Sequence, residues 1–395
     1  MKVAIFGGGV VGGGVVELLR DSRVEIKYLV VRDALKTRDF VVPHGCQVTS
    51  DVATVLKDDS VQIAVELMGG VGMAWDVVKS CLERGIDVVT ANKALISKKL
   101  RDIEKILSTS DNPPVFLYEA AVCGGIPIVN TLLRGLRADK VISIEGVMNG
   151  STNWMLDRME SSGQPYASLL EEAKRLGFLE ADPSADILGW DTRSKLCILS
   201  RIGFGLALDE DCVTCVGIDR VSQEDISYAK SVGKSIKLVA RTWTEAAKVH
   251  ALVMPTLVPK QHSLGTLPGA TNCVCVNAQF SNSHVLSGSG AGRYPTANSV
   301  VADILEIVQL RARGCIRGGD AFGIVSGAER KFDPMFCGAF YVRAVDESGK
   351  SAENSLTLAG VPVTEVGPGY LITGPCQYQL LSSVAPKTAT ILAIL

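Results

Sequence analysis

The sequence predicts an α/β protein that begins with a doubly wound, mostly parallel sheet. A short apolar run at residues 2–6 leads directly into a glycine-rich segment and then into a helical pattern. Short apolar runs alternate with helical stretches as far as residue 118, which is typical of consecutive β-α-β units. The 395 residues are 47% hydrophobic and 21% charged, so the chain is globular and long enough for two or three domains.

Composition and charge exclude several classes of protein. The 40 basic and 42 acidic residues give a formal net charge of −2, which leaves no electrostatic footprint for nucleic acid. No apolar run reaches about 18 residues, so we expect no membrane span. The first apolar run lacks the layout of a signal peptide, and the 11 scattered cysteines, an odd number, favour free thiols in a reducing compartment. We therefore expect a cytoplasmic protein.

The glycine-rich segment after the first strand has the spacing of a dinucleotide-binding loop. Gly7, Gly9 and Gly12 form G-x-G-x-x-G between a predicted strand and a predicted helix. The first glycine permits a tight turn, the second lets a pyrophosphate approach the backbone, and the third allows the helix to pack closely on the strand. With Val10 and Val11, the helix start would offer free N–H groups to the phosphates. A glycine-rich loop without a ligand is the alternative.

The end of the second predicted strand, at residues 25–31, bears on the choice of cofactor. NAD sites place an acid near this point for the ribose 2′-hydroxyl, whereas NADP sites favour an arginine for the 2′-phosphate. Here Arg32 comes first and Asp33 second, and Lys36 and Arg38 add positive charge. We expect NADP as the cofactor, with NAD possible. A solvated charged loop is the competing interpretation.

Three more strands complete the predicted sheet. The strands are expected at 61–67, 86–90 and 115–118, with helices at about 74–84 and 94–107. Ligands of doubly wound sheets lie beyond the carboxyl ends of the strands. The cofactor crevice is therefore expected to include Gly69, Gly70 and Lys93.

Several longer segments resemble the homoserine dehydrogenase family in its order and spacing, over about residues 1–330. They are TANKAL at 90–95, YEAAVCGGIP at 118–127, GVMNGSTN at 146–153, GFLEADP at 177–183, Asp186, GWDTRSKL at 189–196, PTLVP at 255–259 and GAGRYPTA at 290–297. The resemblance implies the reversible reduction of L-aspartate 4-semialdehyde to L-homoserine with NAD(P)H, on the route to threonine and methionine. It also implies a homodimer or a higher homo-oligomer.

The same resemblance implies roles for individual residues. Lys195 is similar to the family's catalytic acid/base, and Lys93 to a residue between nicotinamide and substrate. Gly292 resembles a second contact to the cofactor. The residues similar to substrate ligands are Gly177, Glu180, Asp186 and Asp191. Those similar to a monovalent-cation site, usually sodium, are Glu119 and the carbonyls of Val122, Gly124 and Ile126.

The chemistry of the reaction agrees with these residue types. Hydride transfer to an aldehyde leaves negative charge on the carbonyl oxygen, so a protonated group must donate there. A lysine serves both directions if its pKa falls from about 10.4 toward neutrality. Lys93 and Lys195 would lower each other's pKa if both face one crevice, whereas nearby carboxylates would raise it, and the sequence leaves the net effect open.

Two of the proposed roles have structural alternatives. Asp191 and Lys195 are four residues apart on one helix face, so they could form a surface salt bridge worth about 0.3–0.5 kcal/mol. The helix around them is mostly apolar, which predicts burial instead. Glu119 could simply cap the helix that follows it.

We expect three parts in the chain. Residues 1–135, with a returning helix at about 295–330, would bind NAD(P). Residues 136–294 would form an α+β substrate-binding and dimerisation domain, with the sheet strands at 141–146, 235–242, 249–254 and 273–277 and the helices at 152–160, 166–176 and 191–204.

The third part is a short ACT-like module at 336–395, degenerate and used for regulation or assembly. Its strands are expected at 340–346, 361–366, 370–374 and 388–395, in β-α-β-β-α-β order. The usual Asp-x-Pro-Gly turn is replaced by DESGK at 346–350, which argues against feedback by an amino acid. The final apolar run must be buried or paired, because an exposed edge would aggregate.

Two other functions stay open at this point. One is a related dehydrogenase for another amino aldehyde. The other is a nucleotide-binding regulator without catalysis, against which the presence of both lysines argues. Cys212 and Cys215 form a lone C-x-x-C without a second pair or a nearby histidine, so we expect no metal or redox site there.

Overall fold

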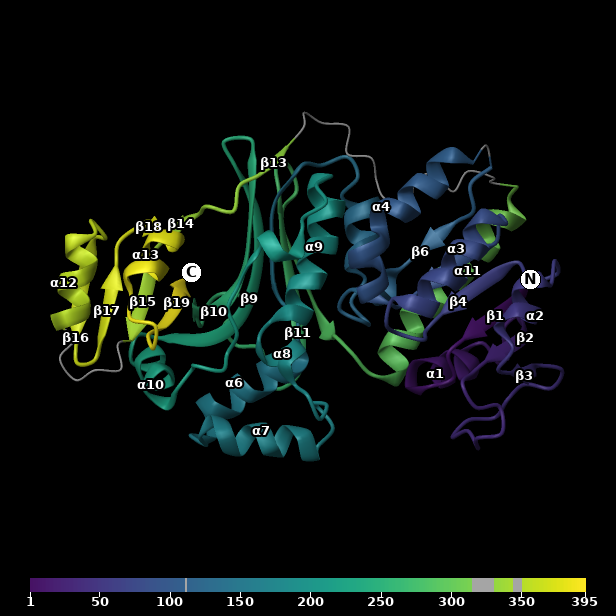
Figure 1. Ribbon diagram of the computed structural model, residues 1–395, viewed down its shortest axis with the longest axis horizontal. Coiled ribbons are helices and arrows are strands. Elements are labelled where there is room, and N and C mark those ends of the chain that lie inside the picture. Colours follow the sequence, from purple (N-terminus) through teal and green to yellow (C-terminus); the bar gives the residue numbers. More distant parts are fainter. Residues whose placement is uncertain (111, 315–329, 344–349) are drawn as a thin grey trace. The chain divides into compact units, whose positions relative to one another are not determined.

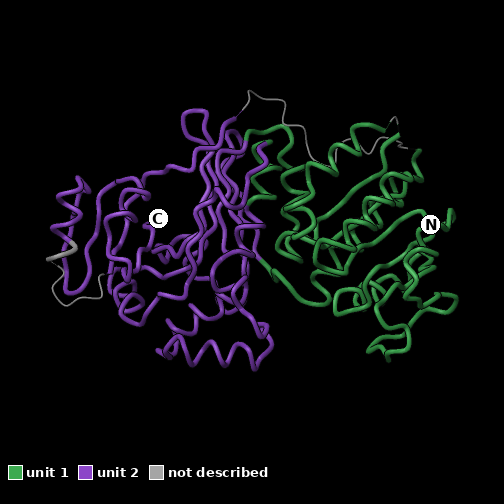
Figure 2. Tube along the Cα trace, in the orientation of Figure 1, with its two compact units in different colours: residues 1–140, 197–205, 288–326 green, residues 141–196, 206–287, 327–395 purple. Residues whose placement is uncertain are grey.

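The computed structural model describes residues 1–110, 112–314, 330–343 and 350–395. Two compact units share the chain (Figure 2). The first comprises Met1–Lys140, Cys197–Gly205 and Gly288–Ser326, and the second comprises Val141–Leu196, Leu206–Ser287 and Gly327–Leu395. Among the helices of the described residues, none is long and apolar enough to cross a membrane.

A six-stranded parallel sheet forms the centre of the first unit (Figure 1). Its order is β3-β2-β1-β4-β5-β6, the strand order of a Rossmann fold, so the prediction of a doubly wound sheet is confirmed. The strands are β1 (Lys2–Phe6), β2 (Glu25–Val30), β3 (Gln47–Thr49), β4 (Ile63–Glu66), β5 (Asp87–Thr90) and β6 (Phe116–Leu117). β3 was not predicted, because its three residues carry no extended apolar run.

Helices cover this sheet. They are α1 (Val10–Leu18), α2 (Val52–Lys57), α3 (Gly72–Glu83), α4 (Lys93–Thr109), α5 (Ile128–Asn130) and α11 (Arg293–Ala312), with a 3₁₀ turn η1 (Glu119–Ala121) and a π-helical turn η2 (Thr131–Gly135). α1 packs closely on α11, since a Cβ added at Gly14 would lie 2.9 Å from the Cβ of Ala297. The predicted returning helix is α11, and the rest of its predicted range, 315–329, lies outside the described residues.

The second unit is built on a large mixed sheet of order β12-β11-β7-β9-β10-β19-β15-β17-β16, with β8 and β13 also paired to β10. Its long antiparallel hairpin joins β9 and β10 over twelve residue pairs from Lys248↔Glu245 to Pro259↔Lys234. The first strands are β7 (Val141–Val147), β8 (Thr214–Cys215), β9 (Lys234–Glu245), β10 (Lys248–Pro259), β11 (Thr271–Ala278), β12 (Asn282–Ser289) and β13 (Lys331–Phe332). β12 is an exposed edge strand rich in serine and glycine, which explains why it was not predicted.

Several helices of the second unit precede the C-terminal strands in the chain. They are α6 (Gly150–Ser162), α7 (Tyr166–Arg175), α8 (Ser184–Ile187) and α10 (Gln223–Ser231), with a 3₁₀ turn η3 (Glu210–Cys212). α9 (Trp190–Phe204) begins in this unit and ends in the first. α6 carries two buried asparagine-centred networks, at Asn149 and Asn153, that position the candidate site.

The last part of the chain has the predicted β-α-β-β-α-β order. Its main elements are β15 (Phe340–Arg343), α12 (Lys350–Leu358), β16 (Val363–Gly367), β17 (Tyr370–Thr373), α13 (Tyr378–Val384) and β19 (Thr390–Ile394), and β14 (Cys337–Gly338) pairs with β18 (Cys376–Gln377). The strands lie in the order β19-β15-β17-β16, each antiparallel to its neighbour, which is a split β-α-β arrangement. That the module is of ACT type stays a prediction, and most of its DESGK turn lies outside the described residues.

The C-terminal strand is buried in the sheet. β19 pairs with β10 on one side, through Thr256↔Ala393 and Leu257↔Ile394, and with β15 on the other. The prediction that the final apolar run is paired is therefore confirmed. The fully buried Asp225 of α10 adds a second link, because it accepts from Tyr341 Oη at 2.9 Å and from Arg343 Nε at 2.8 Å.

Candidate active site

Lys195 lies in a buried ion pair on α9. Its Nζ donates to Asp191 Oδ2 at 2.8 Å and to the carbonyl oxygen of Met148 at 2.7 Å. The side chains of Lys195 and Asp191 are only 10% and 4% exposed. The pair is therefore no solvated surface bridge, and burying it requires further polar partners.

Asn149 supplies such a partner and was missed by the sequence analysis. Its Nδ2 donates to Asp191 Oδ2 at 2.9 Å and to Asp186 Oδ1 at 2.5 Å. Its Oδ1 accepts from the backbone N–H of Thr152 at 2.9 Å and so caps α6. The structure thus brings Asp191 and Asp186 together around one amide, with Lys195 bound to the Asp191 oxygen that the amide also contacts.

Two other predicted substrate ligands lie elsewhere in the second unit. Gly177 and Glu180 are exposed, in the segment between α7 and α8, whereas Lys195 and Asp191 are buried. Gly177 has a φ of +79°, a left-handed conformation that favours glycine at the end of α7. The hydroxyl of Ser151 donates to the carbonyl of Phe178 at 2.6 Å and ties this segment to the start of α6.

The three glycines of the loop in the first unit differ in the space around them. A Cβ on Gly7, whose φ is +122°, would lie 2.6 Å from the carbonyl oxygen of Leu67. A Cβ on Gly12 would lie 2.0 Å from the carbonyl oxygen of Gly7, whereas one on Gly9 would meet nothing within 4 Å. Val10, the first residue of α1, is 65% exposed. Open space over Gly9 at a helix N-terminus fits the pyrophosphate of a dinucleotide.

The segment after β2 presents Arg32 and Asp33 at the surface. The carboxylate of Asp33 accepts from the backbone N–H groups of Leu35 and Lys36, at 2.9 and 3.2 Å, and so is used within its own turn. Arg38 donates to the carbonyl oxygen of Asp33. Asp33 is therefore engaged in its own turn, and the exposed side chain of Arg32 comes directly before it.

A buried network supports the TANK segment at the ends of β4 and β5. Glu66 accepts from Thr90 Oγ1 at 2.7 Å, and burial raises the pKa of its carboxyl. Asn92 caps α4 by accepting from the N–H of Leu95 at 3.1 Å, and it donates to the carbonyl of Gly70 at 2.7 Å. Lys93 follows directly as the first residue of α4. Glu66 was not predicted as a site residue, because its only signal in the sequence is an acid at the carboxyl end of a buried strand.

Three predicted cofactor residues occupy special backbone positions in the first unit. Gly69 and Gly70, in the segment after β4, have φ values of +74° and +70°. Gly292 has a φ of +123° and is the residue before α11. Positive φ at each position explains why glycine is required there.

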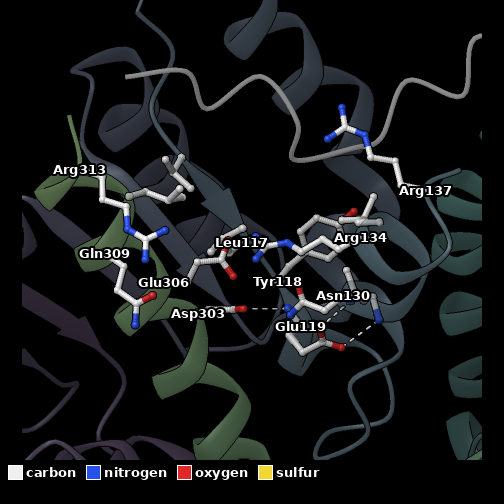
Figure 3. A pocket seen from close by; sticks show the side chains of 14 residues that line it. Leu117, Tyr118, Glu119, Asn130, Arg134, Arg137, Asp303, Glu306, Gln309 and Arg313 are labelled. Carbon is white, nitrogen blue, oxygen red and sulfur yellow. Dashed lines mark hydrogen bonds and ion pairs between the residues drawn. The ribbon is translucent and has the colours of Figure 1, made fainter. Parts of the chain in front are cut away.

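Glu119, the predicted cation ligand, caps α5 (Figure 3). Its carboxylate accepts from the N–H groups of Val129 and Asn130, at 2.9 and 2.7 Å, which is the alternative that the sequence left open. Its own N–H donates to Asp303 Oδ2 at 2.9 Å, and burial raises the pKa of Asp303 to about 8. Arg134 lies beside this acid pair and forms an ion pair with Glu306.

The predicted carbonyl ligands of the cation lie in a left-handed turn of the first unit. Cys123 and Gly124 have φ values of +54° and +47°, between Val122 and Ile126. A Cβ on Gly124 would lie 2.6 Å from the carbonyl oxygen of Gly290, so the turn is closely packed. Among the described residues, no group of three or more His, Cys, Asp or Glu side chains could hold a metal ion.

Comparison with known proteins gives matches over most of the chain. Residues 7–112 match the family model for the NAD-binding domain of homoserine dehydrogenase, and residues 127–305 match the homoserine dehydrogenase model. The homoserine dehydrogenase of Bacillus subtilis is 35% identical over 319 residues, which are 78% of this chain and 73% of the relative. The Synechocystis enzyme is 37% identical over 320 residues, with the same two coverages.

Solved structures agree with these matches. A homoserine dehydrogenase from Thiobacillus denitrificans is similar over 100% of this chain and 98% of its own, with a TM-score of 0.87 and 27% identity. The S. aureus enzyme at pH 6.5 covers 100% of this chain and 99% of its own, with a TM-score of 0.77 and 28% identity. A hyperthermophilic archaeal homoserine dehydrogenase mutant in complex with NADPH covers 78% and 97%, with a TM-score of 0.65 and 25% identity.

The glycine loop yields a prediction that separates folding from cofactor binding. We expect Gly12→Ala to lower the free energy of unfolding by about 1–3 kcal/mol, because the new methyl collides with the Gly7 carbonyl. Gly9→Ala should leave stability unchanged and weaken dinucleotide binding about tenfold, because its methyl occupies the open space. Denaturant unfolding and fluorescence titration with NADPH measure the two effects. Gly135→Ala, also in open space, is the control, and equal effects of all three variants would contradict the prediction.

Proposed function

The chain belongs to the homoserine dehydrogenase family, and on this premise we propose that Lys195 exchanges the proton with the substrate oxygen. The family's reaction is the reversible reduction of L-aspartate 4-semialdehyde to L-homoserine, on the route to threonine and methionine. The observation that carries the proposal is the buried Lys195–Asp191 pair, held further by the carbonyl of Met148.

A bound nicotinamide supplies the hydride in reduction and accepts it in oxidation. As negative charge develops on the substrate oxygen, the Lys195 ammonium stabilises it and donates a proton. In the reverse direction the neutral amine accepts the hydroxyl proton. Asp191 and the Met148 carbonyl restrict the lysine to one direction, which lowers the entropic cost of each transfer.

We propose that acidic side chains recognise the substrate's α-ammonium group. Asp186 and Asp191 lie around one amide, and Asp191 contacts Lys195, so an ammonium bound to both carboxylates would place the rest of a short substrate near the proton donor. Glu180, with backbone of Gly177, is proposed to add a contact from the exposed segment after α7. Lys93 is proposed as the second catalytic lysine, supported by its place directly after Asn92.

Replacing Lys195 tests the proton-transfer role. We expect Lys195→Ala to lower kcat about 100- to 10,000-fold, because general acid–base catalysis is lost. Binding of NADPH should change less than about twofold, since the cofactor loop belongs to the first unit. Lys174→Ala, which removes a half-buried helical lysine of the same unit, is the control. Homoserine oxidation followed at the nicotinamide absorbance decides, and turnover within tenfold of wild type would refute the role.

We propose NADP as the preferred cofactor, with Arg32 as the contact to the 2′-phosphate. The support is that Asp33 is engaged within its own turn and that a related archaeal mutant was solved with NADPH. NAD remains usable, because only the 2′-phosphate contact differs.

Arg32→Ala tests this preference. A charge-assisted hydrogen bond contributes about 1.5–3 kcal/mol, so kcat/KM for NADP should fall about 10- to 100-fold while that for NAD changes little. Arg23→Ala removes an exposed arginine before β2 and serves as the control. An unchanged NADP/NAD ratio in Arg32→Ala would show that another group reads the 2′-phosphate.

We also propose a monovalent cation, sodium, next to Glu119 and the carbonyls of Val122, Gly124 and Ile126. The support is the resemblance together with a buried carboxylate and a closely packed left-handed turn. Oxygen atoms of this kind suit a hard cation. Melting temperature should rise with sodium chloride above its value in choline chloride at equal ionic strength, and Glu119→Gln should reduce that difference. Equal melting curves of the wild-type protein in both salts would argue against the site.

A homodimeric assembly and a cytoplasmic location complete the proposal. The sheet of the second unit ends in the edge strand β12, and such a sheet can continue across a two-fold axis. A monomeric mass in sedimentation velocity would contradict the dimer, and recovery in a membrane fraction would contradict the location.

A further inference from the structure

Asn149 has a side-chain amide whose orientation is determined at both ends. Its Oδ1 accepts from the N–H and from the hydroxyl of Thr152, at 2.9 and 3.1 Å, while its Nδ2 donates to Asp186 and Asp191. A flipped amide would place an NH₂ group against the Thr152 N–H and an oxygen against two carboxylates. Only the observed orientation satisfies all four contacts, and the residue is 5% exposed.

The amide stands between two carboxylates that come from different elements. Asp186 belongs to α8 and Asp191 to α9, and without a donor between them the two negative charges would repel each other. The Nδ2 group contacts both, at 2.5 and 2.9 Å, and thereby sets their separation. The distance between two groups that recognise one ammonium depends on this single donor.

The same amide also controls the direction of Lys195. Asp191 Oδ2 accepts from both Asn149 Nδ2 and Lys195 Nζ, so a shift of Asp191 moves the lysine with it. The second acceptor of Lys195 is the carbonyl of Met148, the residue immediately before Asn149. Two consecutive residues at the end of β7 therefore hold all three charged groups.

A second buried network makes this position rigid from the next turn of α6. Asn153 donates to the carbonyl oxygens of Leu267, Gly269 and Thr271, at 3.3, 2.7 and 3.2 Å. The Nζ of Lys237, a residue only 2% exposed, donates to Asn153 Oδ1 at 2.9 Å. α6 is thereby fixed to β9 and to the segment before β11, and Asn149 cannot follow a displaced carboxylate.

We propose that Asn149 is a positioning residue of this enzyme: its amide sets the spacing of Asp186 and Asp191 and, through Asp191, aims the Lys195 ammonium. The inference rests on the proposed role of Lys195. It assigns to Asn149 a donor function that size or helix capping alone does not provide.

Two substitutions distinguish the donor role of the Asn149 amide from its role as a helix cap and from the size of its side chain. Asn149→Asp keeps the size and the capping oxygen but replaces the donor by a third carboxylate. Asn149→Ser keeps a good capping residue and removes the amide NH₂ without adding charge. We expect kcat for homoserine oxidation to fall at least about 100-fold in the Asp variant and about tenfold in the Ser variant, with NADPH affinity within twofold of wild type.

The pH dependence of activity provides a second test, because a purely structural role of Asn149 would not alter it. Among the described residues, the charged groups in contact with Asn149 are Asp186 and Asp191, and Lys195 is joined to Asp191. Protonation of the carboxyl group that Asn149→Asp introduces would restore one donor, so the activity of this variant relative to wild type should rise as pH falls. The Ser variant should show no such rise.

The kcat values of the two variants distinguish a donor role of Asn149 from a role in shape alone. An Asp variant that is nearly as active as wild type, with a weaker Ser variant, would mean that shape alone matters and would overturn the proposal. Two variants near wild type would overturn it as well. If Asn149→Asp does not fold by circular dichroism, the Ser variant decides alone, since full activity there overturns the proposal and a tenfold loss in kcat supports it. Ser222→Ala, which removes the cap of α10 in the same unit, is the control and should lower stability but not kcat.

Failure of this inference can be told apart from failure of the proposed function. If Lys195→Ala retains turnover, the proton-transfer role itself is wrong. If Lys195→Ala is inactive and Asn149→Asp is near wild type, only the positioning role is wrong.

Discussion

The burial of the Lys195–Asp191 ion pair is the constraint on which the second unit's site depends. Removing two charges from water is costly, and their mutual attraction offsets that cost only with further hydrogen bonds. The carbonyl of Met148 and the amide of Asn149 provide those bonds. Both groups lie at the junction between β7, which ends at Val147, and α6, which begins at Gly150. This junction therefore has to lie at one fixed position along α9. The proposed substrate recognition and the proposed proton transfer both depend on that placement.

Most of the fold could be predicted from the sequence because its signals are local. Buried parallel strands are short apolar runs, and the glycines at 7, 9 and 12 place the first helix directly after the first strand. Strands with a polar or exposed pattern, such as β3 and β12, carry no such signal and were missed. The order of the sheet strands follows from consecutive right-handed crossovers rather than from any one residue.

The site was only partly predictable, for a related reason. Lys195 and Asp191 are neighbours on one helix, so their spacing indicates a pair. Asn149 lies 37 and 42 residues before the two carboxylates that it contacts, and no local pattern reports such a hydrogen bond. Glu66 and Thr90 are likewise separated by 24 residues. Long-range contacts of this kind arise only once the strands and helices have been placed.

The two units nevertheless use one local device at the start of a helix. Asn92 follows β5 and caps α4, and Asn149 follows β7 and caps α6. In each case Oδ1 accepts from the third helical N–H, which leaves Nδ2 to donate to two further acceptors. These are Glu66 and the Gly70 carbonyl in the first unit, and the Asp186–Asp191 pair in the second. A serine or threonine cap would satisfy the helix, but its hydroxyl has a single proton to donate. The need for two donors explains why asparagine stands at these two junctions, beside Lys93 in one unit and near Lys195 in the other.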